Sequence, residues 1–286
     1  MSTSLSNWGR WGDDDQKGSL NLITSDEIVS AASLVKKGKV YSLSMPLDAN
    51  GPQWPSRHKT WQTTSQRNVA EGAGFADDIV MMHSHSGTHM DSLCHLWNDY
   101  QLYNGYDAQE HVTSVGSTRN GIENVPAIVG RGILLDIAGW KGVQHLSLGE
   151  TISASDLDQC ADSQNVTVTS GDIVLINTGW MNVFERDLAL FNSGEPGLDM
   201  STIEWLHKHD VSAIGADNHG VEVMTSVPPM ELPFHFAAIR DLGVYLLENL
   251  KLQPLADDER YKFLFVAAPL RLTSAVGSPI NPLAVI

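Results

Sequence analysis

Four of the chain's 11 histidines lie within thirteen consecutive residues, at positions 83, 85, 89 and 95, and Asp91 stands among them. Imidazole nitrogens and carboxylate oxygens are ligands that divalent transition metals accept together. A single histidine is more often a hydrogen-bonded core or surface residue. Several neutral imidazoles beside a carboxylate are costly to bury unless something uses their lone pairs. The cluster therefore indicates a divalent-metal site.

Three residues of this cluster, His85, His89 and Asp91, supply two nitrogens and one oxygen and leave coordination positions open for water and substrate. Gly87 between the two histidines allows a tight turn, so that ligands close in sequence can converge. This ligand set suits Zn, Mn or Fe. Such an ion polarises a carbonyl group and lowers the pKa of bound water from about 15.7 toward ~7. His95, four residues after Asp91, is a candidate to accept a proton from the attacking water and return it to the leaving group.

Aromatic residues on both sides of the cluster are candidates for the wall of a small substrate pocket. Trp54 and Trp97 are the ones we single out, and each is equally consistent with a core or interface position. Arg57 is a candidate partner for a carboxylate of substrate or product, although a surface arginine is the more common case. Asp217 and Asn218 follow an apolar run. They are candidates to contact the substrate or to support the metal ligands, and a position in a solvated loop is equally consistent with the sequence.

Short apolar runs bounded by turn residues predict the strands that must position these residues. Five such runs span 132–136, 172–177, 211–215, 243–247 and 263–266. Continuous apolar character over that length is typical of central strands in a covered sheet. Capped amphipathic helices are expected near 24–35 and 201–209. Because strands outnumber helices and do not alternate strictly with them, we expect a strand-rich α/β domain and not a doubly wound nucleotide-binding sheet.

The length and patterning predict one domain. The chain has 286 residues, of which 42% are hydrophobic, so it can bury a substantial core. The sequence contains no internal repeat, and its Pro- and Gly-rich stretches are too short for a linker between independent domains. We expect a single domain over residues 1–286, with residues 1–50 as an N-terminal extension packed on it.

The acidic composition excludes some partners. The chain carries 18 Lys and Arg against 34 Asp and Glu, a formal charge of −16, and such a chain repels a phosphate backbone. We therefore expect no nucleic-acid and no membrane partner. With no visible secretory signal or membrane-length apolar stretch, and only two cysteines, Cys94 and Cys160, a cytoplasmic location is the simplest expectation. Cys94 lies inside the histidine cluster, and we interpret it as a buried thiol more readily than as a nucleophile.

The string His85-x-Gly87-Thr88-His89-x-Asp91-x-x-x-His95 resembles the signature of the cyclase-like metal hydrolases, the family that includes bacterial kynurenine formamidase and isatin hydrolase. The family pattern carries a proline two residues after the aspartate, where this chain has leucine. That departure concerns the turn and not the ligands. Further segments that resemble the family are 7–16, 20–23, 130–136, 171–180, 232–235 and 277–282.

The resemblance implies a swivelling β/β/α cyclase-like fold with a mixed, strand-rich sheet and flanking helices, assembled as a homodimer or homotetramer. In relatives with two metal ions, a histidine and a glutamate complete a second site, and the positions similar to them here are His235 and Glu248. The thirteen-residue spacing between these two is one longer than in the formamidases. We therefore expect a site with one ion, Mn²⁺ or Zn²⁺, in preference to a site with two. In the alternative interpretation these two residues bind no metal: His235 would cap a helix, and Glu248 would accept backbone hydrogen bonds.

These observations predict a metal-dependent hydrolase that opens a small cyclic amide, a lactone or an aryl formamide with activated water. Two alternatives stay open. The same ion and histidine would serve a cyclase or dehydratase acting on a small hydroxy acid, because a Lewis acid and a base also support proton abstraction. A binding protein with a structural metal is the other, and such sites are normally closed by four protein ligands.

Overall fold

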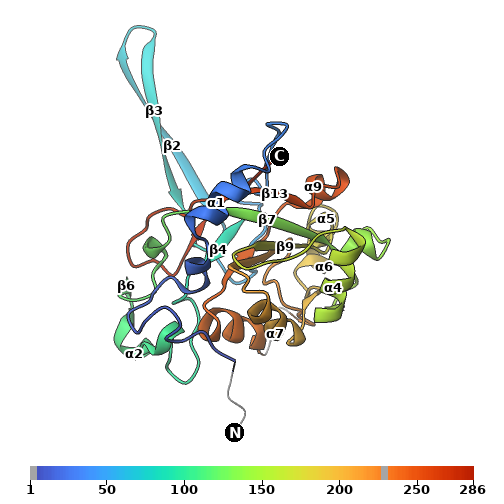
Figure 1. Cartoon of the computed structure of the whole chain (residues 1–286). Coiled ribbons are helices and arrows are strands. Elements are labelled where there is room, and N and C mark those ends of the chain that lie inside the picture. Colours follow the sequence, from blue (N-terminus) through green and yellow to red (C-terminus); the bar gives the residue numbers. More distant parts are fainter. Residues whose placement is uncertain (1–4, 227–230) are drawn as a thin grey trace.

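The computed structural model describes residues 5–226 and 231–286. Its centre is a mixed nine-stranded sheet in the order β1-β15-β13-β7-β9-β11-β12-β4-β14, with helices along its flanks (Figure 1). The strands are β1 (Val40–Ser42), β4 (His89–Asp91), β7 (Ile128–Asp136), β9 (Ile173–Asn177), β11 (Ala213–Ala216), β12 (Tyr245–Glu248), β13 (Lys262–Ala267), β14 (Gly277–Pro279) and β15 (Leu283–Val285). The prediction of a strand-rich α/β fold with a mixed sheet is confirmed.

Four parallel strands, β7, β9, β11 and β12, form the middle of this sheet, and the remaining pairings are antiparallel. All residues of β9, β11 and β12 are buried. Strands covered on both faces have no solvent-facing side, which explains why their sequences are continuous apolar runs and not alternating ones. All five predicted strands are present, although β7 begins four residues before the predicted position.

The predicted helices are both present. α1 (Ser25–Ala32) starts with a capping box between Thr24 and Glu27, as its sequence indicates. α7 (Ser201–Lys208) lacks the predicted side-chain cap, because its N-cap residue is Met200 and Ser201 is already the first helical residue. The other helices are α2 (Ala108–His111), α3 (Ile137–Trp140), α4 (Ala154–Ser163), α5 (Trp180–Phe184), α6 (Leu188–Phe191), α8 (Pro233–His235), α9 (Gln253–Asp257), the 3₁₀ turns η1 (Gly18–Leu22), η2 (Tyr103–Gly105) and η3 (Ile122–Asn124), and the π-helix η4 (Phe236–Asp241).

The chain before residue 50 is tied to the sheet and to η4. β1 pairs with β15 at the sheet edge. The backbone N–H of Asn7 donates to the Asp241 carbonyl at 2.9 Å, and the indole of Trp8 donates to the Arg240 carbonyl at 2.6 Å. A single domain over residues 1–286 stays a prediction. Within 5–226 and 231–286, no helix has the length and apolar character needed to cross a membrane.

Three two-stranded sheets complete the structure. Two are short: β5 (Val112–Thr113) pairs with β6 (Gly116–Ser117), and β8 (Thr151–Ile152) with β10 (Gly197–Leu198). The third is long. β2 (Trp61–Ala70) and β3 (Ala73–Met81) form a hairpin that projects away from the body of the molecule (Figure 1). No strand was predicted in this region, because its apolar residues are too sparse to mark a core element.

Candidate metal centre

The metal motif is carried by the sheet through β4, which lies between β12 and β14. The register places His89 of β4 directly opposite Glu248 at the end of β12. The Nδ1 atom of His89 donates to the Gly87 carbonyl oxygen at 2.9 Å, which directs Nε2 to within 2.9 Å of a Glu248 carboxylate oxygen. With the proton on Nδ1, Nε2 presents a lone pair to that carboxylate. A proton or a metal ion between the two atoms would satisfy both, and Glu248 raises the pKa of His89 against the effect of burial.

His85 lies in the connection from β3 to β4, and its Nε2 atom is 3.2 Å from the Asp91 carboxylate. Gly277 of β14 pairs opposite Asp91, and a Cβ atom on this glycine would lie 2.5 Å from the same His85 nitrogen. Only glycine therefore allows the imidazole to reach its position. The turn ahead of β4 depends on Gly87, whose φ of 62° is in the left-handed region that favours glycine.

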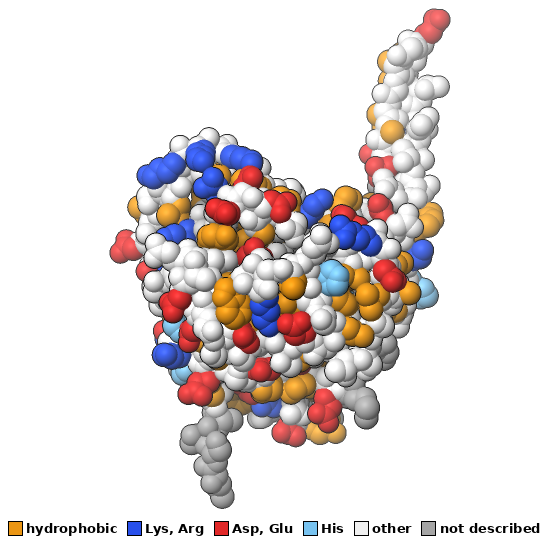
Figure 2. Space-filling view, turned by 90° about the vertical axis from the view of Figure 1, so that its right-hand side faces the viewer, with side chains coloured by type: hydrophobic (Ala, Val, Ile, Leu, Met, Phe, Trp, Pro, Cys, Tyr) orange, Lys and Arg blue, Asp and Glu red, His pale blue; other side chains and the backbone are white. Residues whose placement is uncertain are grey.

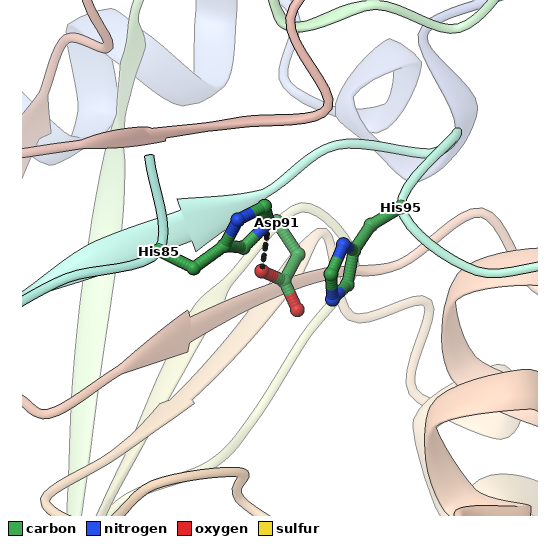
Figure 3. Close-up of side chains that lie close together, drawn as sticks. All are labelled: His85, Asp91 and His95. Carbon is green, nitrogen blue, oxygen red and sulfur yellow. Dashed lines mark ion pairs between the residues drawn. The ribbon is translucent and has the colours of Figure 1, made fainter. Parts of the chain in front are cut away.

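Two overlapping groups of side chains could hold a metal ion, and Asp91 belongs to both. One group is His85, Asp91 and His95, whose rings and carboxylate face one another in Figure 3, and the other is His89, Asp91 and Glu248. The candidate ligand atoms of each group lie within 4.8 Å of one another. This places all three predicted ligands in one cluster, with Glu248 as a fourth candidate.

The buried atoms of this cluster fit a cation. Among the described residues, His85 Nε2, His89 Nε2 and both carboxylate oxygens of Asp91 are buried and make no hydrogen bond of good geometry, although the two nitrogens lie 3.2 and 2.9 Å from the Asp91 and Glu248 carboxylates. Unsatisfied buried polar atoms are costly and rare in folded proteins, and here they converge on one place. A divalent metal would satisfy them together, and the mixture of nitrogen and oxygen donors suits Zn²⁺ or Mn²⁺.

His235 is held between two carboxylates beside this cluster. Its Nδ1 atom bonds to Glu222, and its Nε2 atom lies 3.2 Å from Glu248. Glu222 also accepts hydrogen bonds from the backbone N–H groups of Phe234 and His235, both at 3.2 Å. His235 does not share either compact ligand group within the described part of the chain. Glu222 therefore orients His235 toward Glu248. The sequence places Glu222 in a polar stretch but does not reveal its contact with His235.

The electrostatics follow from burial and close charges. Burial lowers the pKa of His95 to about 3. Burial also disfavours charge on His235, but Glu222 and Glu248 outweigh it and raise its pKa to about 10. Burial alone raises the pKa of Asp91, whereas His95 and His85 bring it below its usual range. At neutral pH the His95 imidazole is therefore neutral.

A cavity of about 130 Å³ opens beside the cluster. Its lining combines predicted site residues with others that the sequence did not indicate. It comprises Trp54, Arg57, His95, His219, Gly220, Met224, Leu232, His235 and Glu248. Arg57 donates from Nη1 to the His85 carbonyl oxygen at 2.6 Å. Trp54 meets His219 edge to face, with ring centroids 5.8 Å apart. Two of the predicted substrate residues, Trp54 and Arg57, therefore line the cavity with the candidate base His95.

The other three candidate substrate residues lie elsewhere. Trp97 is 43% exposed and is not part of the cavity lining. Asp217 accepts hydrogen bonds from the backbone and hydroxyl of Thr178, at 2.8 and 2.6 Å, and Asn218 donates to the Pro196 carbonyl. Their contacts to protein groups give no support to a substrate role, which stays a prediction. Cys94 is buried, and burial raises the pKa of its thiol, as expected for an unreactive cysteine.

Two residues of the cavity wall and its support, His219 and Glu195, were missed from the sequence. His219 is buried and bonds through Nε2 to Asn192 at 3.1 Å. Glu195 is fully buried and accepts the backbone N–H groups of His219 and Gly220 at 2.7 and 2.8 Å, and burial raises its pKa well above the usual range. Glu195 therefore fixes the turn that carries the cavity wall. In the sequence, the adjacent His219 and Gly220 are the local feature that indicates this turn.

Comparisons with known proteins agree with this geometry. The family described as "Putative cyclase" matches residues 41–223. A crystal structure described as a novel cyclase has a TM-score of 0.90 and 38% sequence identity, covering 99% of this chain and 100% of the other. The kynurenine formamidase of Geobacillus thermodenitrificans is 27% identical over 84% of this chain and 93% of its own length. The isatin hydrolase of Roseibium aggregatum is 25% identical over 76% of this chain and 77% of its own.

Proposed function

The chain belongs to the cyclase family, and on that premise we propose that it is a metal-dependent hydrolase of a small cyclic amide, lactone or aryl formamide. The observation that carries the proposal is the set of partnerless buried donor atoms on His85, His89 and Asp91 beside a small cavity. The relatives named kynurenine formamidase and isatin hydrolase support the reaction class, hydrolysis of a non-peptide C–N bond.

The proposed ligands are His85, His89 and Asp91, with Glu248 next to them. A bound divalent ion supplies Lewis-acid activation of water and of the substrate carbonyl. We propose one ion, because Asp91 is shared by both ligand groups and His235 is already held by Glu222 and Glu248. Mn²⁺ and Zn²⁺ are the candidates.

The chain's own residues provide the proton transfers and the binding site. His95 lines the cavity with its ring 4.0 Å from that of His85, so it can take a proton from water and return it to the leaving nitrogen or oxygen. Trp54 and Arg57 also line the cavity, and an aromatic face and a cation suit a ring that carries a developing carboxylate. A cavity of about 130 Å³ has room for roughly one ring, since a buried cavity of about 150 Å³ holds benzene.

The decisive experiment is a turnover assay in ¹⁸O-labelled water with formanilide, isatin, a coumarin-type lactone and a small hydroxy acid, each with Mn²⁺ or Zn²⁺. Hydrolysis must place one solvent oxygen in the product carboxylate. A product formed without solvent oxygen from a small hydroxy acid would support the dehydratase alternative. Absence of turnover with every probe, despite stoichiometric metal, would favour the metal-stabilised binding protein.

The cavity lining gives a matched pair of variants for the substrate assignment. Trp54→Ala should raise KM by about three- to tenfold, because one well-packed aromatic contact contributes roughly 0.5–1.5 kcal/mol. Trp97→Ala removes a tryptophan of the same size outside the lining and should leave KM within about twofold. Steady-state kinetics on the best substrate measures both. Equal effects of the two changes would remove the assignment of Trp54 to the substrate pocket.

A further inference from the structure

His219 is a histidine of the cavity wall that the proposed reaction does not use. It is 3% exposed and lines the same cavity of about 130 Å³ as the candidate base His95. The Trp54 ring meets it edge to face, and the Phe191 ring centroid lies 4.4 Å from its own. The backbone N–H of His219 donates to Glu195 at 2.7 Å. These contacts hold the imidazole in place.

The two ring nitrogens of His219 have different surroundings. Nε2 lies 3.1 Å from the side-chain carbonyl oxygen of Asn192. A carbonyl oxygen only accepts hydrogen bonds, so Nε2 carries the proton and Nδ1 carries a lone pair. Nδ1 has no hydrogen-bond partner within residues 5–226 and 231–286, and it is accessible to solvent. Because the residue is otherwise buried in the wall, this lone pair opens into the cavity.

Burial keeps this acceptor uncharged. It lowers the pKa of His219 to about 3, and the nearby Glu248 opposes the effect only in part. A carboxylate acceptor would favour a cationic group, and such acceptors are plentiful outside the cavity, since Figure 2 shows acidic side chains scattered over the face drawn there. A neutral imidazole nitrogen in an enclosed site instead matches a neutral donor, such as an amide N–H.

The other polar side chains of the cavity already have partners or a proposed role. Glu248 lies close to the two histidines on either side of it. Arg57 can only donate hydrogen bonds. His95 is the proposed base for the attacking water. Among the described lining residues, His219 therefore supplies the side-chain acceptor that is free to bind a ligand.

We propose that His219 is a specificity-determining residue, whose Nδ1 atom accepts a hydrogen bond from a donor group on the bound substrate. The inference rests on the proposed hydrolase function and narrows it. A lactam or an aryl formamide has an N–H next to its carbonyl group, whereas a lactone has only an oxygen there. A site built to receive an N–H rejects the analogue without one, because its buried acceptor is then left unpaired.

The ring nitrogens of His219 can be observed by ¹⁵N nuclear magnetic resonance of the full chain with labelled histidine, and the His219→Asn spectrum assigns them by their loss. We expect a protonated Nε2 and an unprotonated Nδ1. Pyrrolidin-2-one, which has an N–H, should shift the Nδ1 resonance, whereas γ-butyrolactone, its ester counterpart of the same size, should not. A proton on Nδ1, or the same response to both probes, would overturn the proposal.

Kinetics on a matched pair of substrates is the second measurement. Formanilide and phenyl formate differ only in N–H against oxygen, so the quantity of interest is the ratio of their kcat/KM values. An asparagine amide lies near the position of Nδ1, and a glutamine amide lies near that of Nε2. His219→Gln should lower the formanilide-to-phenyl formate ratio by roughly 10–100-fold, because the substrate N–H is left unpaired. His219→Asn should lower it by less than about threefold. The same ratio in wild type and His219→Gln would contradict the assigned role.

Failure of this inference differs from failure of the proposed function. If the wild type hydrolyses neither formanilide nor phenyl formate, the hydrolase proposal loses support, and the response of the His219 Nδ1 resonance to pyrrolidin-2-one still decides the role of this residue. If the wild type hydrolyses both compounds and Nδ1 responds to neither probe, the hydrolase stands and the role of His219 is wrong.

Discussion

At the scale of single residues, the metal centre depends on a glycine that supplies no ligand. A Cβ on Gly277 would lie 2.5 Å from His85 Nε2, so Gly277→Ala must displace this imidazole. We expect a roughly 10–100-fold weaker metal affinity, similar to the loss of a group that orients a ligand. Gly38→Ala is the control for metal affinity: its Cβ meets open space, and the strain that alanine adds at its φ of 66° lies in the turn before β1 and displaces no metal ligand. Chelator competition measures both, and unchanged affinity in Gly277→Ala would contradict the assigned position of His85.

Asp217 gives a pH-dependent prediction that does not involve the metal. Burial raises its pKa from 3.8 to about 6, so the folded state binds this proton more tightly than the unfolded chain does. The free energy of unfolding therefore falls as the pH rises from about 4 to about 6, by about 2–3 kcal/mol for this group. Asp217→Asn keeps an oxygen acceptor for Thr178 but does not ionise, so it should lack this decrease.

Urea unfolding of both proteins from pH 4 to pH 7 tests this prediction. The difference in unfolding free energy, variant minus wild type, should increase over that interval. Asp162→Asn removes the same charge from an exposed position on α4 and should not change with pH in this way. Parallel curves for Asp217→Asn and wild type would show that the carboxyl is not titrating as its burial requires.

At the scale of elements, the sequence predicted where the strands lie better than it predicted which strands pair with each other. The apolar runs before Asn177 and Glu248 identified β9 and β12, because central parallel strands must be apolar on both sides. The pairing of β4 with β12 and β14 was not readable, since both partners lie more than 150 residues away in the chain. Glu195 was missed as a support for the same reason, whereas Glu222 could be singled out as polar but its partner His235 could not. Their partners are set by tertiary contacts.

Thr88 joins three of these elements and shows why the motif needs a threonine there. Its hydroxyl donates to the Asn249 carbonyl after β12 at 2.6 Å and accepts from the backbone N–H of Met45 after β1 at 2.9 Å. Thr88→Val keeps the shape but leaves both buried backbone groups without a partner. We expect a loss of about 2–4 kcal/mol in unfolding free energy. Thr167→Val, at an exposed position, should change it by less than about 0.5 kcal/mol.

Urea unfolding at neutral pH, with metal present in both samples, measures these two variants. If Thr88→Val were as stable as Thr167→Val, the Thr88 hydroxyl would not be the link between β1, β4 and β12. If Thr88→Val retains its metal, Thr88 stabilises the fold and does not act as a metal ligand.

At the scale of the whole molecule, the α/β class could be predicted, and so could the clustering of the candidate ligand residues, but the shape could not. The spacing of His85, His89 and Asp91 is local, so one β-strand and one turn are enough to bring them together. The β2–β3 hairpin at 61–81 could not be predicted from its composition. Its apolar residues occupy one face of a hairpin that has no partner within the chain, and such a pattern is weaker than that of a core strand.

The most direct test of the central claim is the metal content per folded chain, measured by mass spectrometry on wild type, Asp91→Asn and His83→Ala. Asp91 belongs to both ligand groups, whereas His83 lies in the same stretch of sequence but is exposed and accepts a hydrogen bond from the His58 backbone. We predict about one equivalent in wild type and in His83→Ala, and almost none in Asp91→Asn. Wild-type protein that binds no metal after supplementation, or Asp91→Asn that retains it, would contradict the account.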